Sequence, residues 1–236
     1  MKLLKFRLYG SFAHFNQPAS NLFKNTYSII PKPHLLGILG AIVGLRGYIN
    51  KDTVPEYYER LSDIQIYIYP KNKRDRKFVV TYNSLNSFLN NRKDVSSPNV
   101  IIKEQILMDP DYEIGLVLNE ENELHNKIIE NIKSNKSVFN VYFGKNEFPA
   151  SIEYISLEDL TNNSQTSVNC QSIFPFELLS NGINKTNFKL EMIPFGFDEN
   201  FKYIYCLMAV PETIAKICVT NPNDFIVSGD RAYYVF

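Results

Sequence analysis

The chain of 236 residues is 44% hydrophobic and 21% charged, with a formal net charge of zero at pH 7, which is the composition of an ordinary soluble globular protein. Its longest apolar run, residues 35–45, is too short to span a bilayer, and its start lacks the features of a signal peptide. The three cysteines have no paired spacing and do not form a disulfide framework. We therefore expect a cytoplasmic protein with a buried core and no membrane contact.

The zero net charge conceals two halves of opposite sign. Residues 1–103 carry 16 Lys and Arg against six Asp and Glu, a net charge of +10, whereas residues 104–236 carry nine against 19, a net charge of −10. The first 51 residues contain no Asp or Glu at all. A basic half of this kind predicts a face that binds a polyanion. The alternative is that the two halves pair with each other.

The first 45 residues predict a strand, a long loop and a buried helix. Residues 2–9 alternate between apolar side chains and a basic, aromatic face, which is typical of a half-buried strand. Residues 10–32 show no periodicity but are rich in aromatic residues, and a loop of this length in a compact domain is usually functional. Residues 34–45 form an apolar helix in which Gly37, Gly40 and Gly44 share a face, so close packing should offset their low helix propensity. Its N-terminus is a candidate phosphate site.

A basic arm is predicted after the second strand. Residues 52–61 read as a helical connection, and residues 64–69 alternate as a strand whose outer face carries two tyrosines. The sequence KNKRDRK, residues 71–77, then places five cations and one acid next to this strand. Such a run can be a solvated hairpin tip, but beside aromatic residues it favours contact with RNA. We expect the arm to cover about residues 71–100.

The remaining elements predict an α+β fold. Residues 101–108 and 112–118 read as strands, followed by an amphipathic helix with Asn119 as its N-cap, and by a strand over residues 138–143. The resulting order of strands and helices is that of the ferredoxin-like (RRM) domain. Further strands are expected at 188–193, 203–210, 214–219 and 232–236. We predict a ferredoxin-like domain over residues 1–149 and a β-rich C-terminal part over residues 150–236 packed on it.

The sequence shows no motif for metal or cofactor chemistry. The three histidines, His14, His34 and His125, lack the spacing of a metal site, and neither nucleotide-binding glycine motif is present. We therefore predict no metal and no cofactor. A metal-free ribonuclease could still use His14 with Tyr27 or Lys24 as general acid and base, although no spacing singles these residues out.

Two stretches near the start of the chain match a family pattern, FRLYGSFAHF and NTYSIIPKPHLLGILGAIVGL. The matching positions are Gly10, Phe12, Ala13, Phe15, Tyr27, Ser28, Pro31, Pro33, Gly37, Gly40, Ala41 and Gly44. Through these residues the opening of the chain resembles the CRISPR-associated Cas5 family of the RAMP superfamily. A weaker likeness continues through NVYFGKNEFPASI, residues 140–152, where Phe143 replaces the usual leucine. The rest of the chain matches in length and order more than in motif.

This resemblance implies a RAMP protein that is a subunit of Cascade, the type I CRISPR surveillance complex of antiviral defence. In this family the subunit holds the 5′ handle of the crRNA beside the backbone and large subunits, and a thumb-like arm lies over the guide. The likeness is greatest to the subtype I-B form. Whether such a protein touches target DNA indirectly is left open.

Binding without cleavage is the function we expect. In the subtype I-C branch this subunit cuts precursor RNA with a Tyr, His and Lys set, but no neighbouring His and Lys occur in this sequence. The alternatives are a metal-independent endoribonuclease that processes repeat RNA and a scaffolding protein that binds no RNA. The predicted RNA-binding residues are Arg7, His14, Lys24, Asn25, Tyr27, Lys32 and Arg46 for the handle and Lys71, Lys73, Arg74 and Arg76 for the arm.

Overall fold

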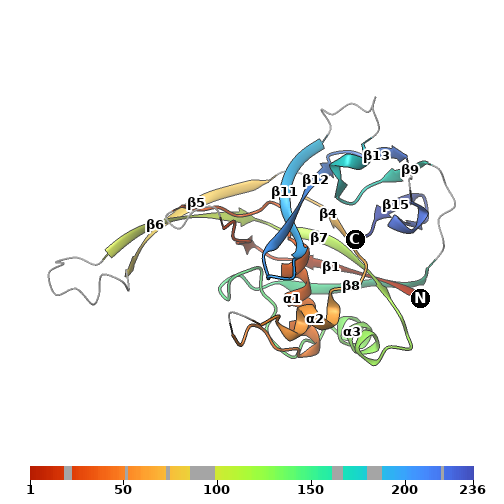
Figure 1. Cartoon of the computed structure of the whole chain (residues 1–236), viewed down its shortest axis with the longest axis horizontal. Coiled ribbons are helices and arrows are strands. Elements are labelled where there is room, and N and C mark those ends of the chain that lie inside the picture. The colour runs from red at the N-terminus through yellow and green to blue at the C-terminus, as the bar shows by residue number, and fades with distance from the viewer. Residues whose placement is uncertain are drawn as a thin grey trace.

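The computed structural model describes residues 1–18, 23–50, 53–72, 75–85, 99–160, 167–179, 188–218 and 221–236. A long two-stranded ribbon projects from a body of sheets and short helices (Figure 1). The helices are α1 (Lys32–Val43), α2 (Glu56–Leu61) and α3 (Glu123–Lys133), with 3-10 turns at Phe176–Leu178 and Pro222–Asp224. The strands are β1 (Lys2–Tyr9), β2 (Phe12–Ala13), β3 (Phe23–Lys24), β4 (Ile66–Pro70), β5 (Arg76–Leu85), β6 (Asn99–Met108), β7 (Asp111–Leu118), β8 (Ser151–Asp159), β9 (Ser167–Cys170), β10 (Phe174–Pro175), β11 (Phe188–Phe197), β12 (Tyr203–Pro211), β13 (Ala215–Cys218), β14 (Phe225–Ser228) and β15 (Arg231–Tyr234).

The central sheet has the strand order β4-β7-β1-β8, and all of its neighbouring strands are antiparallel. The chain passes through α1 and α2 between β1 and β4, and through α3 between β7 and β8. Leu4, Phe6 and Leu8 of β1 are fully buried in the same core cluster as the apolar side chains of α1 and α3. The alternation in residues 2–9 thus directs one set of side chains toward the helices, as predicted.

The opposite face of the central sheet is covered by the C-terminal strands. Leu3, Tyr67 and Val117 form a second buried cluster with side chains of β14 and β15. The rings of Tyr67 and Tyr233 are stacked with centroids 4.1 Å apart. The sheet is therefore buried on both faces, which explains why Tyr67 is fully buried although the sequence predicted it on an outer face.

Helix α1 begins two residues before the predicted start and ends at Val43, with Gly44 as its C-cap. Close packing at the glycine face occurs against α2, as predicted. A Cβ atom added to Gly40 would lie 2.5 Å from the Cβ of Tyr57, a distance that real side chains do not reach. Only glycine lets the two helices approach this closely.

Two local predictions were wrong. Residues 138–143 do not form a strand, because the N–H groups of Val138 and Phe139 donate instead to the carbonyls of Ile42 and Ala41, at the C-terminal end of α1. The N-cap of α3 is Asn122 rather than Asn119, since its side chain accepts hydrogen bonds from two N–H groups of the first turn. The strand that follows α3 in the central sheet is β8.

The C-terminal part is rich in strands, as expected. The four strands predicted from residue 188 onward correspond to β11, β12, β13 and β15, whereas the short strands β9, β10 and β14 were not predicted. They form a β10-β12-β11 sheet and a β13-β9-β15-β14 sheet. The division of the chain at residue 150 remains a prediction, although β8, which follows that position, is the edge strand of the central sheet.

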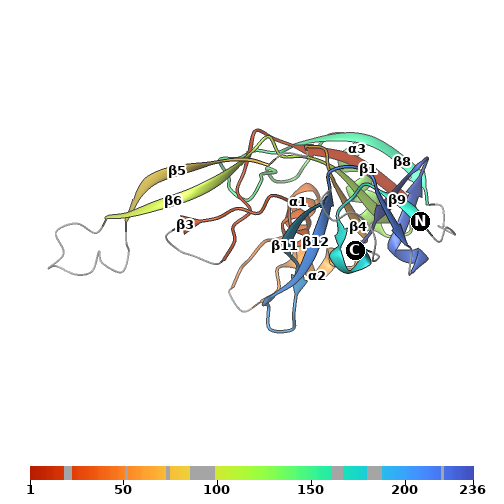
Figure 2. The same ribbon diagram turned by 90° about the horizontal axis from the view of Figure 1, so that it is seen from above.

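The arm is a ribbon of β5 and β6, which pair antiparallel from Arg76 opposite Met108 to Leu85 opposite Asn99. Residues 86–98, within the predicted arm, lie outside the described residues. The long N-terminal loop contributes to the root of the arm, because β2 and β3 both pair with β6. Figure 2 shows β3 beside the ribbon. The aromatic loop predicted from the sequence is therefore joined to the basic arm.

Candidate nucleic-acid interface

Three aromatic rings gather where the arm joins the body. Phe12 of β2 lies 5.7 Å from Phe78 of β5 and 6.1 Å from Phe148, measured between ring centroids. Phe12 and Phe78 are 39% and 38% exposed. They share one face of the ribbon because Phe12 and Arg76 both lie opposite Met108, and Phe78 follows two residues later. We call the face with these three rings the arm root. Partly exposed rings of this kind are suitable for stacking unpaired bases.

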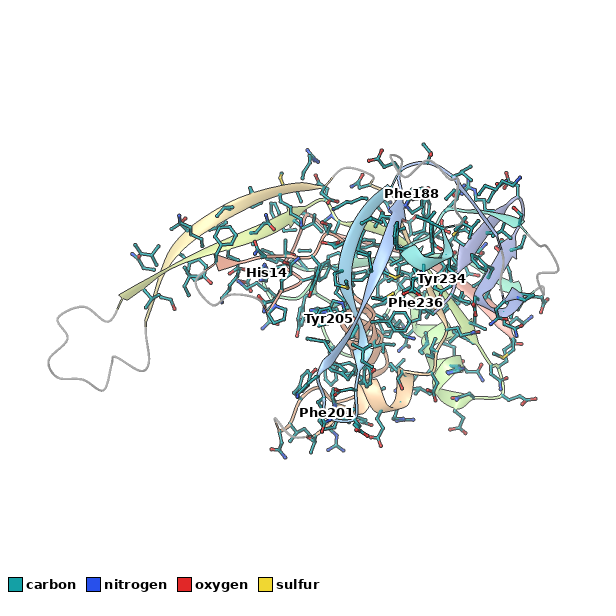
Figure 3. All side chains as sticks on the ribbon, turned by 45° about the horizontal axis from the view of Figure 1, so that its top comes forward. His14, Phe188, Phe201, Tyr205, Tyr234 and Phe236 are labelled. Carbon is teal, nitrogen blue, oxygen red and sulfur yellow. The ribbon has the colours of Figure 1, made fainter. Side chains whose placement is uncertain are left out.

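A buried carboxylate, that of Glu104, contacts several polar side chains on the same face of the arm. Glu104 of β6 is 1% exposed, and its oxygens accept hydrogen bonds from Lys145 Nζ at 2.7 Å and from Tyr82 Oη at 2.9 Å. The ring nitrogen His14 Nδ1 lies 3.6 Å from the same carboxylate and 2.9 Å from the carbonyl oxygen of Gln105. Because a carbonyl only accepts, the second contact places the proton of a neutral imidazole on Nδ1. Figure 3 shows His14 near the point where the arm leaves the body.

The charges of this cluster stabilise each other. Burial opposes the ionisation of Glu104, but hydrogen bonds from Lys145 and Tyr82 outweigh it, so the pKa of the carboxyl is below its usual value. Burial likewise opposes the charge of Lys145, and its hydrogen bonds to Glu104 and Glu147 raise the pKa above the usual value. Glu104 and Lys145 are therefore an ion pair at neutral pH. This ion pair between Glu104 and Lys145 connects strand β6 of the arm to the segment that follows Gly144.

Several cations surround the arm root. Arg76 is exposed and paired with Asp109, and Lys71 is exposed. Lys103, next to Glu104 along β6, is exposed on the opposite face of the ribbon. Lys24 is half-buried in β3 and lies opposite Glu104 in the strand register. Within the part of the chain that the structure describes, the ammonium groups of Lys24, Lys71 and Lys103 make no ion pair. Exposed cations beside exposed aromatic rings are the combination that binds single-stranded nucleic acid.

Four of the predicted handle residues are engaged inside the protein. Arg7 pairs with Asp111 at 2.9 Å and with Glu153 at 3.3 Å. His14 is 4% exposed and Tyr27 is also 4% exposed. The roles predicted for these residues in RNA binding remain predictions, and the contacts made by Arg7 and His14 are with protein groups.

Lys32 is the clearest case of a cation used by the fold. It is 9% exposed, and its ammonium donates to the carbonyl oxygen of Phe236 at 2.9 Å. The rings of Phe195 and Phe236 lie 5.6 and 5.7 Å from this ammonium. Burial lowers the pKa of Lys32 to about 8. The ammonium that the sequence placed beside a phosphate at the N-terminus of α1 thus contacts groups of the protein itself.

The remaining predicted residues divide between two places. Asn25 is half-buried next to Lys24, and its carbonyl accepts a hydrogen bond from the N–H of Gln17 at 2.9 Å. Arg46 is away from the arm root, after the end of α1, with 76% of its side chain exposed and Glu56 at 3.7 Å. Lys73 and Arg74 lie outside the described residues.

Sequence reasoning missed most of the arm root. Phe78, Tyr82, Glu104 and Lys145 were not selected, because the four belong to separate segments that meet only in the folded chain. Two signals were present: Glu104 is a carboxylate within a strand pattern that is otherwise apolar on that face, and Lys145 follows a glycine of the segment that resembles a family motif.

Among the described residues there is no group of three or more His, Cys, Asp or Glu side chains that could hold a metal ion. Nor does any helix in the described ranges have the length and apolar character needed to cross a membrane.

The fold is that of CRISPR-associated proteins. One similar structure is titled CRISPR RNA-guided surveillance complex, with 13% identity, a TM-score of 0.55 and coverage of 91% of both chains. A CRISPR protein from Archaeoglobus fulgidus has 14% identity and a TM-score of 0.51, covering 100% of this chain and 98% of that one. A chain of the Type III-B Cmr-beta complex bound to cognate target RNA has 13% identity and a TM-score of 0.50, with coverage of 97% and 99%.

The family is shown by the sequence itself. Residues 3–194 match the family described as CRISPR-associated protein (Cas_Cas5), which is most of the chain. The chain belongs to this family. The resemblance seen in its first fifty residues is thereby confirmed. A search of curated proteins finds no match.

Proposed function

We propose that this protein is a non-catalytic RNA-binding subunit of a CRISPR ribonucleoprotein, in which it holds the single-stranded 5′ handle of the guide RNA. The observation that carries the proposal is the arm root, where partly exposed rings of Phe12 and Phe78 lie among exposed cations. Unpaired bases stack on such rings, and the cations contact the phosphates. Membership of the Cas5 family and the titles of the similar structures, which name an RNA-guided surveillance complex and a target-RNA complex, support this role.

The proposal extends to the type of domain, the CRISPR subtype and the protein partners. The antiparallel order β4-β7-β1-β8, with helical connections from β1 to β4 and from β7 to β8, supports a ferredoxin-like RAMP domain. We assign the protein to a type I Cascade of subtype I-B, in the cytoplasm, with the backbone and large subunits as its protein partners. Exposed apolar side chains on β11 and β12, among them Leu190, Met192 and Ile204, support a role as one subunit of a larger assembly.

The proposal is tested by the salt dependence of RNA binding. In Lys24→Ala, the affinity for a single-stranded handle RNA should fall about two- to fivefold, as expected for one partly exposed charge contact. The slope of log Kobs against log salt concentration should become shallower by about 0.7, the value for one phosphate contact on a single strand. Fluorescence anisotropy with labelled RNA, at five salt concentrations, measures both quantities.

Two control variants make this test specific. Lys216→Ala removes an exposed cation from β13, on the side of the body away from the arm (Figure 1). Lys32→Met removes a buried cation while keeping an apolar chain between Phe195 and Phe236. Both controls should bind RNA like the unmodified protein. Equal salt slopes for Lys24→Ala and the unmodified protein would refute the Lys24 contact, and the absence of any salt-dependent RNA binding would refute the proposed function.

RNA cleavage is the second candidate, and one observation favours it. The sequence argued against a nuclease because it has no neighbouring His and Lys, but the fold brings His14, Lys145 and Tyr82 onto Glu104. Their present contacts favour binding over cleavage. His14 is 4% exposed, and both Lys145 and Tyr82 donate to a buried carboxylate, contacts that support a structural role over proton exchange with an RNA 2′-hydroxyl.

Incubation of the purified protein with labelled repeat RNA in EDTA tests this second candidate. We expect the RNA to remain intact over hours in a gel assay. A single specific cut that disappears in both His14→Ala and Lys145→Ala, while Lys216→Ala still cuts, would instead assign a metal-independent nuclease to the Glu104 cluster.

A further inference from the structure

A cavity lies next to the segment that precedes Lys145. It has a volume of about 660 Å³ and is lined by residues of α1 that include Gly37, the segment that follows α1, Tyr57 of α2, residues 139–144 and Tyr203 of β12. Its volume is within the range of about 300–1,000 Å³ that is typical of small-molecule sites. Of the described residues that the sequence predicted to bind RNA, Arg46 alone lines this cavity.

Aromatic rings dominate the wall. Six of them come from five separate parts of the chain: Phe15, Tyr48, Tyr57, Phe139, Tyr142 and Tyr203. Tyr48 is 62% exposed, Phe139 51% and Tyr142 41%. Large rings that remain this exposed around one concave site indicate a surface that is covered when a ligand binds. Flat rings facing a common space are suited to a flat ligand.

The polar groups of the wall narrow the class of ligand. Arg46 is the one charged residue among those that line the cavity, and the lining includes no carboxylate and no cysteine. A metal ion would lack its ligands here, and a multiply charged anion would meet a single cation. Asn140, His34 and the hydroxyl groups of the lining tyrosines supply the remaining polar groups. These groups fit a flat, uncharged ring that forms hydrogen bonds and is attached to a group with one negative charge.

His34 adds an observation that the fold does not explain. Its imidazole lines the cavity, packed edge-on against Phe15 with centroids 5.7 Å apart, and its Nδ1 is buried with no hydrogen-bond partner among the described residues. Burial, with a smaller effect of His14, lowers the pKa of His34 to about 4. A neutral imidazole has one donor and one acceptor, and leaving such a group unpaired inside a protein costs stability.

One segment of the chain borders both the cavity and the arm root. Phe139 and Tyr142 line the cavity, whereas Lys145 and Phe148, a few residues later, belong to the arm root. A single strand lying across this segment would reach both places. We infer that the cavity accepts one unpaired nucleobase of the bound RNA, stacked against its tyrosine rings, with Arg46 contacting the adjoining phosphate. This inference rests on the proposed RNA-binding function.

Single-position fluorescent labelling tests the inference. A series of handle RNAs, each with 2-aminopurine replacing one base, is titrated with the full chain, because stacking on aromatic rings quenches 2-aminopurine. We expect strong quenching at one position that is lost in Tyr142→Ala and in Tyr48→Ala, with RNA affinity falling about fivefold or more, the effect of losing one stacked base. Tyr154→Ala is the matched control, because Tyr154 is 37% exposed but lies on β8 outside the cavity.

The outcomes separate this inference from the proposed function. RNA binding of normal affinity, with no position whose quenching depends on Tyr142 or Tyr48, would overturn the cavity assignment and leave the RNA-binding function intact. Failure to bind any of the RNAs would overturn both. Free 2-aminopurine riboside 5′-monophosphate is titrated in parallel: saturable quenching by this mononucleotide, without a quenched position in RNA, would show a free-nucleotide site and overturn the inference. Melting curves of each variant check that both substitutions, at exposed tyrosines, leave the protein folded.

Discussion

Replacing Phe78 by alanine should weaken binding of single-stranded RNA by about five- to 100-fold, because each base stacked on an aromatic ring contributes about 1–3 kcal/mol. Phe78 is 38% exposed and belongs to the ring cluster at the arm root, so its loss removes stacking area without opening the buried core. Equilibrium binding of a labelled handle RNA measures the effect. Unlike removal of a cation, this substitution should leave the slope of the salt dependence unchanged.

The neighbouring residue offers a matched control. Val79 is 49% exposed, and because side chains alternate along a strand it faces the opposite side of the arm. Val79→Ala should bind RNA within about twofold of the unmodified protein, since it removes exposed apolar area from the face without the ring cluster. Equal losses for Phe78→Ala and Val79→Ala would mean that the arm contributes through its stability and not through stacking at the arm root.

Gly144→Ala should lower the free energy of unfolding by about 2–5 kcal/mol. Gly144 has a φ of +81°, a conformation that costs an alanine about 1–2 kcal/mol. In addition, a Cβ atom at this position would lie 2.0 Å from the carbonyl oxygen of His14. That oxygen is a backbone atom that cannot rotate away, so the segment itself must move, at an overpacking cost of about 1–3 kcal/mol. Urea denaturation measures the change.

A second glycine separates the two costs. Gly229 also has a positive φ, +63°, but a Cβ added there would have nothing within 4 Å. Gly229→Ala should therefore lose only the conformational part, about 1–2 kcal/mol. The difference between the two variants measures the contact between Gly144 and His14. If both variants lost the same stability, the close approach of these two segments in solution would be excluded. Because Lys145 follows Gly144, the first variant should also weaken RNA binding.

Local pattern was sufficient for most of the secondary structure. Strand β1, helix α1 and the paired strands of the arm follow from alternation, apolar periodicity and turn residues, which depend on neighbours a few positions away. Besides the short strands β9, β10 and β14, which were not predicted, the segment 138–143 was an exception. It reads as a strand, but its N–H groups bond to the end of α1, a partner that its own sequence cannot reveal.

The candidate sites were predicted less completely, and the reason is the range of the contacts involved. A count of positive charges cannot tell a cation that faces solvent from one that the fold uses. Lys24 and Lys32 look alike in the sequence, yet Lys24 has no carboxylate partner among the described residues, whereas Lys32 donates to Phe236 at the opposite end of the chain. The same applies to His14 and Lys145, which are distant in sequence and both contact Glu104.

The sequence by itself determined that the chain is a member of the Cas5 family with a basic N-terminal half, an arm after its second predicted strand and a glycine-faced helix, because motifs and charge are properties of residues near one another. The tertiary structure alone decided which of these residues remain accessible. It joined the aromatic loop to the arm through β2 and β3, buried three of the predicted ligands, His14, Tyr27 and Lys32, and enclosed a ring-lined cavity between five segments. Accessibility depends on contacts between distant segments, and those exist only once the chain has folded.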